Sequence, residues 1–325
     1  MLFAKGHGTG NDFLVIPDPD DQLALSPELV ARLCDRRTGL GADGVLRAVR
    51  SSALRHSWPE QLAPRPERVA PAPSPESSGG AGQLGCPGDD HDAEWFMDYR
   101  NADGSLAEMC GNGVRVFARY LLDRQLTAGP EVTVATMAGV RRVRENADGD
   151  LTVDMGPVRV LGRGRAVVGD RDCEGLALSV GNPHLACLVA EPVASFDLSA
   201  PPAVDAAAFR DGVNVELLRV TGPRQLEMRV HERGSGVTLS CGTGAVAAAA
   251  AAAVAAGELP AEEDPSGQRP DGPGRSWIVD VPGGRLAVTP SVTASLLTGP
   301  AVIVAEGHLE DAWLARLSAA PSGIA

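Results

Sequence analysis

The sequence predicts a mixed α/β fold built from two related halves. Two observations carry this prediction: strand-like segments outnumber helical ones without regular alternation, and one short motif occurs twice. A length of 325 residues agrees with two domains, since a domain has roughly 150 residues. Hydrophobic residues make up 44% of the chain and charged residues 22%, so the protein can bury a sizeable core.

The expected strands are short runs rich in apolar and β-branched residues. They span residues 12–16, 45–49, 93–101, 131–136, 151–155, 185–190, 214–220, 225–232, 277–282 and 301–307.

Three segments have helical character, and they span residues 27–37, 113–124 and 245–256. In the second segment, Val114, Phe117, Ala118 and Leu121 fall at i, i+3, i+4 and i+7, which predicts one buried face. The third segment is almost entirely alanine, the best helix former, and Gly257 follows it as a stop signal. This run is too short to span a bilayer, which needs about 20 apolar residues, so we expect a buried helix.

Two stretches lack any hydrophobic period and are rich in Pro, Ser and Gly. They cover residues 51–92 and 260–275. Such segments cannot bury enough apolar surface to offset their ordering entropy, so we interpret both as mobile loop insertions.

Charge and cysteine content exclude several classes of function. The net charge of −13 and the low aromatic content of 4% are atypical of a nucleic-acid binder. The chain opens with MLFAKGHGTGND, which lacks the apolar core of a signal peptide, and no segment reaches membrane-spanning length. The six cysteines form neither a CxxC pair nor a Cys/His metal pattern. We therefore expect a cytoplasmic protein with reduced thiols and no metal site.

The most informative feature is a near-repeat around two cysteines. MCGNGVRVFARYL begins at Met109 and SCGTGAVAAAAAA begins at Ser240, and in each a Cys-Gly-polar-Gly turn leads into a helix. Cys110 and Cys241 are 131 residues apart. A polar residue ends a strand-like run nine positions before each cysteine, Asn101 in the first copy and Glu232 in the second. We infer two related domains, each presenting a cysteine at a helix N-terminus.

This geometry suits acid–base chemistry on a substrate that carries a carboxylate. The first turn of a helix has unpaired N–H groups and a partial positive charge, which can hold a carboxylate. The same environment is expected to lower the pKa of the thiol. Two facing thiols can remove a proton from one side of a carbon and add one to the other, which inverts the centre.

Other interpretations of the two turns stay open at this point. A cysteine before glycine is often a small packed residue, and a disulfide between Cys110 and Cys241 is conceivable. Neither turn matches GxGxxG or the P-loop pattern. A binding protein without catalytic activity would carry the same turns, but it would not need both thiols.

At these residues the chain resembles the diaminopimelate epimerase family. The resemblance covers nearly the whole chain outside the two insertions, and its motifs are KGHGTGNDF (5–13), CDRRTGLGADG (34–44), YRNADGSLAEMCGNGVR (99–115), GNPH (181–184), NVELL (214–218) and HERGSGVTLSCGTGA (231–245). It implies two similar domains related by a pseudo-twofold axis, each a curved, mainly antiparallel sheet around a central helix. The active site would lie in the cleft between them. The implied domains are residues 1–154, with a return of residues 300–325, and residues 155–299.

The resemblance also implies the site and its chemistry. Cys110 and Cys241 would be the catalytic acid/base pair, acting without cofactor or metal, and His184 and Glu232 would support them. The implied substrate contacts are Asn11, Asn101, Gly111, Asn112, Asn182, Asn214, Glu232, Arg233, Gly242 and Thr243. Among these, the side chains would bind the two ends of the substrate, while the backbone N–H groups of the Gly-rich turns would bind the α-carboxylate.

The implied reaction interconverts LL- and meso-2,6-diaminopimelate, in lysine and peptidoglycan biosynthesis, and the implied assembly is a homodimer. A sister activity on the same fold, proline or hydroxyproline racemisation or a double-bond shift, stays open as an alternative. The chain departs from the family pattern at Gly44, where many members have Gln. No side-chain contact to the substrate is possible from that position.

Overall fold

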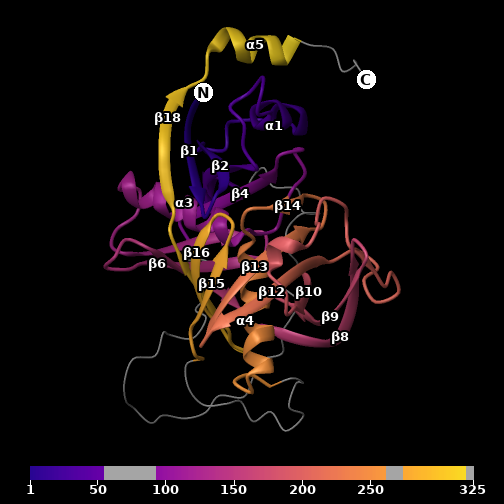
Figure 1. Ribbon diagram of the computed structural model, residues 1–325. Coiled ribbons are helices and arrows are strands. Elements are labelled where there is room, and N and C mark those ends of the chain that lie inside the picture. Colours follow the sequence, from indigo (N-terminus) through magenta and orange to yellow (C-terminus); the bar gives the residue numbers. More distant parts are fainter. Residues whose placement is uncertain (55–92, 261–273, 320–325) are drawn as a thin grey trace, which may run out of the picture.

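The computed structural model describes residues 1–54, 93–260 and 274–319 (Figure 1). Most of the two expected loop insertions, residues 55–92 and 261–273, lies outside these ranges. Within the described part of the first insertion, Ser51–Leu54 forms a short helix, α2.

The first half of the fold is a sheet of eight strands. In spatial order they are β18 (Val302–His308), β1 (Leu2–Gly8), β2 (Asn11–Pro17), β3 (Gly44–Arg50), β4 (Trp95–Asn101), β5 (Glu131–Thr136), β6 (Gly139–Glu145) and β7 (Leu151–Gly156). The pairs β2–β3 and β4–β5 are parallel, and the other neighbours are antiparallel.

The second half repeats this pattern strand for strand. Its order is β8 (Arg159–Val168), β9 (Arg171–Ser179), β10 (Pro183–Leu188), β12 (Asn214–Gly222), β13 (Gln225–Glu232), β15 (Trp277–Val281), β16 (Gly284–Thr289) and β17 (Ser295–Gly299). Here β10–β12 and β13–β15 are the parallel pairs. The short strands β11 (Ala203–Val204) and β14 (Gly236–Thr238) pair with β8 and β13, and a 3₁₀ turn spans Val193–Ser195.

Each half receives one strand from the other end of the connection: β8 follows the first half in sequence but lies in the second sheet, and β18 follows the second half but lies in the first sheet. After β7 the chain crosses into the second half, where β8 pairs with β9. After β17 it crosses back, and β18 pairs with β1. An antiparallel pair between β7 and β17 joins the two sheets directly.

One helix runs through each half. α3 (Gly111–Asp123) packs against the eight strands of the first sheet, and α4 (Gly242–Ala255) packs against β9, β10, β12, β13, β15, β16 and β17. α4 is buried on every side from Gly242 to Ala253, and its alanines leave room for the sheet to approach closely. The expected mixed α/β fold with mainly antiparallel sheets is confirmed.

The remaining helices are peripheral. α1 (Pro27–Cys34) and α5 (Asp311–Ala319) lie at the end of the first half where the chain starts (Figure 1). α1 ends three residues before the expected limit, because the Asp35 side chain accepts hydrogen bonds from the N–H groups of Arg37 and Thr38 and starts a turn.

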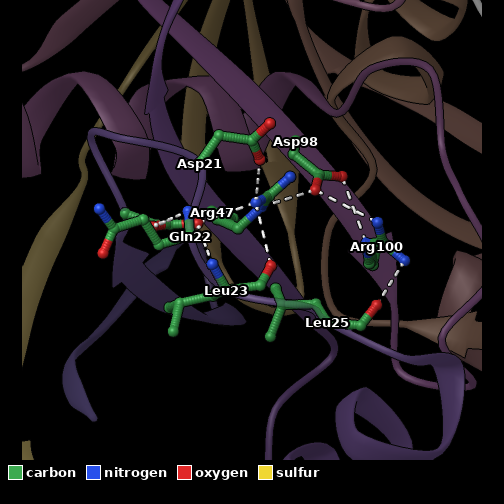
Figure 2. Close-up of polar contacts among 8 residues, drawn as sticks. Asp21, Gln22, Leu23, Leu25, Arg47, Asp98 and Arg100 are labelled. Atoms are coloured by element: carbon green, nitrogen blue, oxygen red, sulfur yellow. Dashed lines mark hydrogen bonds and ion pairs between the residues drawn. The ribbon is translucent and has the colours of Figure 1, made fainter. Parts of the chain in front are cut away.

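A buried ion cluster fixes the loop before α1 to the face of the sheet opposite α3. The Arg47 guanidinium contacts the carboxylates of Asp18, Asp21 and Asp98 at 2.9, 2.6 and 2.9 Å. Arg100 contacts Asp98 at 3.3 Å and donates to the carbonyl of Leu25 at 2.9 Å (Figure 2). The cluster makes β3 and β4 a rigid support for the residues at their ends.

The strands that the sequence did not reveal are β1, β6, β8, β9, β11, β14, β16 and β17. β1 shows why: at Gly6 an added Cβ would lie 2.7 Å from the carbonyl oxygen of Val302 in β18. Close packing there requires a glycine, which removes the apolar alternation that marks a strand.

Candidate active site

Each repeat turn places its cysteine as the N-cap of the central helix. The Cys110 sulfur accepts a hydrogen bond from the N–H of Gly113 at 3.4 Å, and the Cys241 sulfur accepts one from Gly244 at the same distance. Both cysteines have extended backbone dihedrals, as N-cap residues do. The expectation of a thiol at each helix N-terminus therefore agrees with the structure.

The starts of the two helices touch. A Cβ added at Gly242 would lie 3.0 Å from Cα of Gly111 and 3.4 Å from the backbone nitrogen of Asn112. A Cβ at Gly111 would meet Cε of Met155 at 2.9 Å. The glycine at position 242 thus lets the helix starts approach closely, whereas a Cβ at position 111 would first meet the flexible end of the Met155 side chain. The unpaired N–H groups of the two helix starts converge on the junction between the halves.

The expectation of lowered thiol pKa values was wrong. Burial raises the pKa of the Cys110 thiol to about 11, against the smaller lowering effect of its hydrogen bond from Gly113. Burial also raises the pKa of the Cys241 thiol well above its usual value, and the nearby Glu232 and Glu216 carboxylates raise it further. The position of each thiol at a helix N-terminus could be predicted from the sequence. The burial that raises the thiol pKa more than the helix N-terminus lowers it could not.

Glu232 ends β13 and lies beside Cys241. Its carboxylate accepts a hydrogen bond from the Thr238 hydroxyl and is hydrogen-bonded to the Cys241 thiol. Burial raises the pKa of the Glu232 carboxyl group, although both hydrogen bonds oppose this shift. A carboxylate in this position can accept the proton of the thiol.

A second chain of polar groups reaches Cys241 from β10 and β12. His184 Nδ1 lies 2.7 Å from Glu216 Oε1, and its Nε2 lies 2.9 Å from Asn182 Oδ1. Asn182 then donates to the Thr243 hydroxyl at 3.4 Å, and that hydroxyl lies 3.5 Å from the Cys241 sulfur. His184 and Glu216 are fully buried, so the chain rigidly orients the groups around this thiol.

The remaining sequence-derived contact residues lie at or directly next to strand ends. The Asn11 side chain, 8% exposed, has an Oδ1 atom with no hydrogen-bond partner among the described residues, as expected of a group that binds a ligand. Asn101 donates to the Ser105 hydroxyl at 3.0 Å. Asn214 accepts from the backbone N–H of Arg233 at 2.8 Å. The Arg233 guanidinium is exposed and donates to the carbonyl of Asp211 at 2.8 Å.

The site explains why a glycine occupies position 44. A Cβ there would lie 2.6 Å from the carbonyl oxygen of Arg100 and 2.8 Å from Cε2 of Tyr99. The Tyr99 ring packs edge-on against Phe13, with ring centroids 5.9 Å apart. Burial raises the pKa of Tyr99, and nearby acidic groups, among them Cys110 and Glu232, raise it further. Tyr99 occupies the space that a longer residue at position 44 would need.

Sequence reasoning missed three residues of this region: Glu216, Tyr99 and Arg115. Glu216 carried a usable signal, because a carboxylate inside the apolar strand NVELL must have a buried partner. Arg115 likewise falls within an apolar helix and is fully buried. Tyr99 carried no signal beyond its position two residues before Asn101.

The family model for "Diaminopimelate epimerase" matches residues 74–161 and 176–304. The chain is 52% identical to a diaminopimelate epimerase of Thermobifida fusca, over 95% of this chain and 98% of that protein. The chain belongs to the diaminopimelate epimerase family. It is also 46% identical to family members of Mycobacterium tuberculosis and Streptomyces coelicolor, over 96% and 97% of its length.

Solved structures share the fold with much lower sequence identity. A probable proline racemase from Agrobacterium radiobacter superposes with a TM-score of 0.61 at 14% identity, covering 95% of this chain and 93% of that one. A hydroxyproline epimerase from Agrobacterium vitis gives a TM-score of 0.57 at 16% identity, covering 94% and 90%. These matches establish the fold. The diaminopimelate epimerase family is identified by the closer sequence relatives.

Proposed function

We propose that this protein interconverts LL- and meso-2,6-diaminopimelate as a cofactor-independent epimerase, the reaction of its family. The observation that carries the site assignment is the contact between two helix N-termini, each capped by a cysteine. Cys110 and Cys241 are the proposed acid/base pair. The 52% identity to a diaminopimelate epimerase supports the substrate, and no feature of the site favours the sister activities over it.

The proposed reaction is a pair of proton transfers. One cysteine, as a thiolate, takes the α-proton, and the bonding electrons of the C–H bond stay on the α-carbon. The other cysteine, as a thiol, gives its proton to the opposite face, so one thiol and one thiolate are present again at the end. The two cysteines have exchanged roles, and the reverse reaction uses the same groups in the opposite order.

The helix N-termini make this reaction feasible. The α-proton of an amino acid is weakly acidic, and its removal spreads negative charge into the α-carboxylate. Backbone N–H groups at Gly111, Asn112, Gly242 and Thr243 are the proposed donors for that charge. They need no reorganisation, because the helices hold them in place.

Because burial raises the pKa values of both thiols, we expect both to be protonated in the free protein at neutral pH. One thiol must therefore lose its proton when the substrate binds. For Cys241 the proposed acceptor is the Glu232 carboxylate, to which the thiol is hydrogen-bonded. The ammonium group of the substrate adds a positive charge close by, which favours the thiolate.

Further proposals concern the remaining polar residues and the assembly. Asn11, Asn101, Asn182, Asn214 and Arg233 are proposed to bind the polar ends of the substrate, with His184 in a supporting role. We also propose a cytoplasmic homodimer and a two-domain division close to β7. None of the described helices is long and apolar enough to cross a membrane.

An exchange assay tests the function. Incubation with LL-diaminopimelate in D₂O should give the meso isomer with deuterium at the inverted α-carbon, measured by NMR and chiral chromatography. Cys110→Ala and Cys241→Ala should each abolish epimerisation, because each face needs its own proton carrier. Absence of both isomer conversion and exchange, with both thiols shown to be reduced, would refute the proposal.

A further inference from the structure

Arg115 is an unusual residue for the interior of a helix packed against a sheet. It follows Cys110 by five positions on α3, and its side chain is fully buried. It forms no salt bridge with a described carboxylate, and burial lowers its pKa more than the charge of Asp150 raises it. Its Nε atom donates to the carbonyl oxygen of Pro300 at 3.5 Å, and its Nη1 atom has no hydrogen-bond partner among the described residues. An unpaired buried charge destabilises the folded protein, so its contribution must lie in the groups it holds.

The Arg115 guanidinium fixes the orientation of the Asn112 side chain. Arg115 Nη2 donates to Asn112 Oδ1 at 2.8 Å. With its oxygen held in this way, the amide turns its NH₂ group the other way, and Nδ2 donates to the carbonyl oxygen of Ser240 at 3.0 Å. Ser240 belongs to the second half and directly precedes Cys241.

A second hydrogen bond reaches the same residue. The Thr9 hydroxyl, in the turn between β1 and β2, donates to the Ser240 hydroxyl at 2.7 Å. Arg115 Nη2 also lies 3.5 Å from this Thr9 hydroxyl. Thus two residues of the first half hold Ser240, and Arg115 contacts both. We call Thr9, Asn112, Arg115 and Ser240 the interdomain link.

The interdomain link has no counterpart from α4 to the first half. The positions of α4 that correspond to Asn112 and Arg115 are Thr243 and Val246, 131 residues further on. The Thr243 hydroxyl contacts Asn182 and Cys241, both in its own half. Only α3 therefore reaches across to the residue before the opposite cysteine, and the link does not arise from the repeated fold alone.

We propose that Arg115, acting through Asn112, is a positioning residue that holds Cys241 opposite Cys110, so that the two thiols act on opposite faces of one α-carbon. This inference rests on the proposed epimerase function. The buried Arg115 lowers the stability of the fold, but it serves catalysis because the interdomain link sets the relative position of the two proton carriers.

Loss of the link has a specific consequence for the two proton transfers. Cys110 would still remove a proton, but a displaced Cys241 would deliver one slowly to the other face. The carbanion would then recover a proton from Cys110 and return to the starting isomer. Solvent deuterium would enter that isomer whenever the Cys110 thiol exchanged its proton. Starting from the other isomer, the displaced Cys241 would have to remove the proton first, and no such exchange would occur.

Three variants test the proposal. Arg115→Met removes the guanidinium, and Asn112→Asp keeps a partner for Arg115 but removes the donor to Ser240. Arg119→Met is the matched control, since Arg119 lies one turn further on α3 and pairs with Glu145 at 2.7 Å, away from the link. For each protein, the epimerisation rate and the deuterium content of recovered substrate are measured in D₂O from the LL and the meso isomer, together with the melting temperature.

The deuterium content of the recovered substrate separates a positioning role from a structural one. The equilibrium constant fixes the ratio of kcat/KM in the two directions, so epimerisation must fall in both. We expect kcat/KM for epimerisation to fall about tenfold or more in Arg115→Met and Asn112→Asp, because displacing a catalytic group slows the reaction. Exchange should exceed epimerisation from one isomer only. Arg119→Met should behave like the wild type.

Two results would overturn the inference. One is epimerisation by Asn112→Asp at the wild-type rate. The other is a ratio of exchange to epimerisation that matches the wild type from both isomers, which would assign the loss to general misfolding. An inactive wild-type protein would instead refute the proposed function, so the two failures are distinguishable.

Discussion

The two thiols proposed as the acid/base pair sit in different electrostatic surroundings although their local backbone is the same. Cys110 is partly exposed, and burial raises the pKa of its thiol to about 11, against smaller lowering effects of the Gly113 N–H group and the Arg115 charge. Cys241 is 6% exposed and has the carboxylates of Glu232 and Glu216 as neighbours. The two repeats therefore share their backbone geometry, but the charged side chains around the two cysteines differ.

This difference predicts how the thiols react with an alkylating agent. Because the pKa of Cys110 is raised to about 11, its thiolate fraction should grow about tenfold per pH unit between pH 7 and 10. Iodoacetamide should modify Cys110 faster than Cys241, at a rate that rises across this whole range, as followed by peptide mass spectrometry. Cys110→Ser is the control for the assigned peptide. A rate that levels off near neutral pH would show that the pKa is lowered instead.

Position 44 gives a second prediction at this scale. Gly44→Gln should destabilise the protein by about 1–3 kcal/mol, because its Cβ would overlap Tyr99 and the Arg100 carbonyl. Urea denaturation measures the loss. Gly222→Ala, whose Cβ would lie 3.7 Å from Gln225, should change stability little. Equal stability of Gly44→Gln and the wild type would contradict the packing argument.

At the scale of elements, the contact between α3 and α4 controls the site. Gly242→Ala places a methyl group 3.0 Å from Cα of Gly111 and must push the helix starts apart. We expect kcat to fall about tenfold or more, since sub-ångström misplacement of catalytic groups is costly. Helix propensity alone would make alanine favourable at this position.

A control variant that lowers helix stability without moving the helix start separates the two effects. Ala255→Gly, at the exposed last residue of α4, should lower the melting temperature and leave kcat unchanged. Calorimetry and steady-state kinetics on both variants provide the comparison. An active Gly242→Ala protein would show that the two helix starts can separate without harm.

The sequence was most informative about these elements and least about their surroundings. The repeated turn predicted both central helices and the capping cysteines, because glycine and cysteine spacing is a local property. The raised thiol pKa values and the His184–Glu216 pair depend on burial by strands distant in sequence. β8 was missed because half of its ten residues are exposed and it is rich in arginine and glycine, so that it lacks an apolar period.

At the scale of the whole molecule, the exchange of β8 and β18 makes each half incomplete without the other. Residues 1–156 contain β1 but not its partner β18, and residues 157–325 contain β9 with β8 but lack β7, the partner of β17. We expect residues 1–156 alone to remain unfolded, because the fragment would lose the β1–β18 ladder, the β7–β17 ladder and the contacts of α3 with β18 and α4. Co-expression of both fragments should restore a folded complex.

Circular dichroism and co-purification test this expectation. The intact chain should unfold in a single transition, with equal calorimetric and van't Hoff enthalpies, since neither sheet can persist alone. Two separate transitions, or a folded 1–156 fragment, would contradict the mutual dependence of the halves.

The late arrival of β18 also matters while the protein is being made. Leu2 pairs with His308, so the outermost ladder of the first sheet joins residues from opposite ends of the chain. At about 5–20 residues per second, a ribosome needs roughly 15–60 s to synthesise the chain between them. Throughout that time β1 presents open hydrogen-bonding groups to every other nascent chain nearby. Because β18 is made last, the growing chain is most prone to aggregation in the period before this strand can pair with β1.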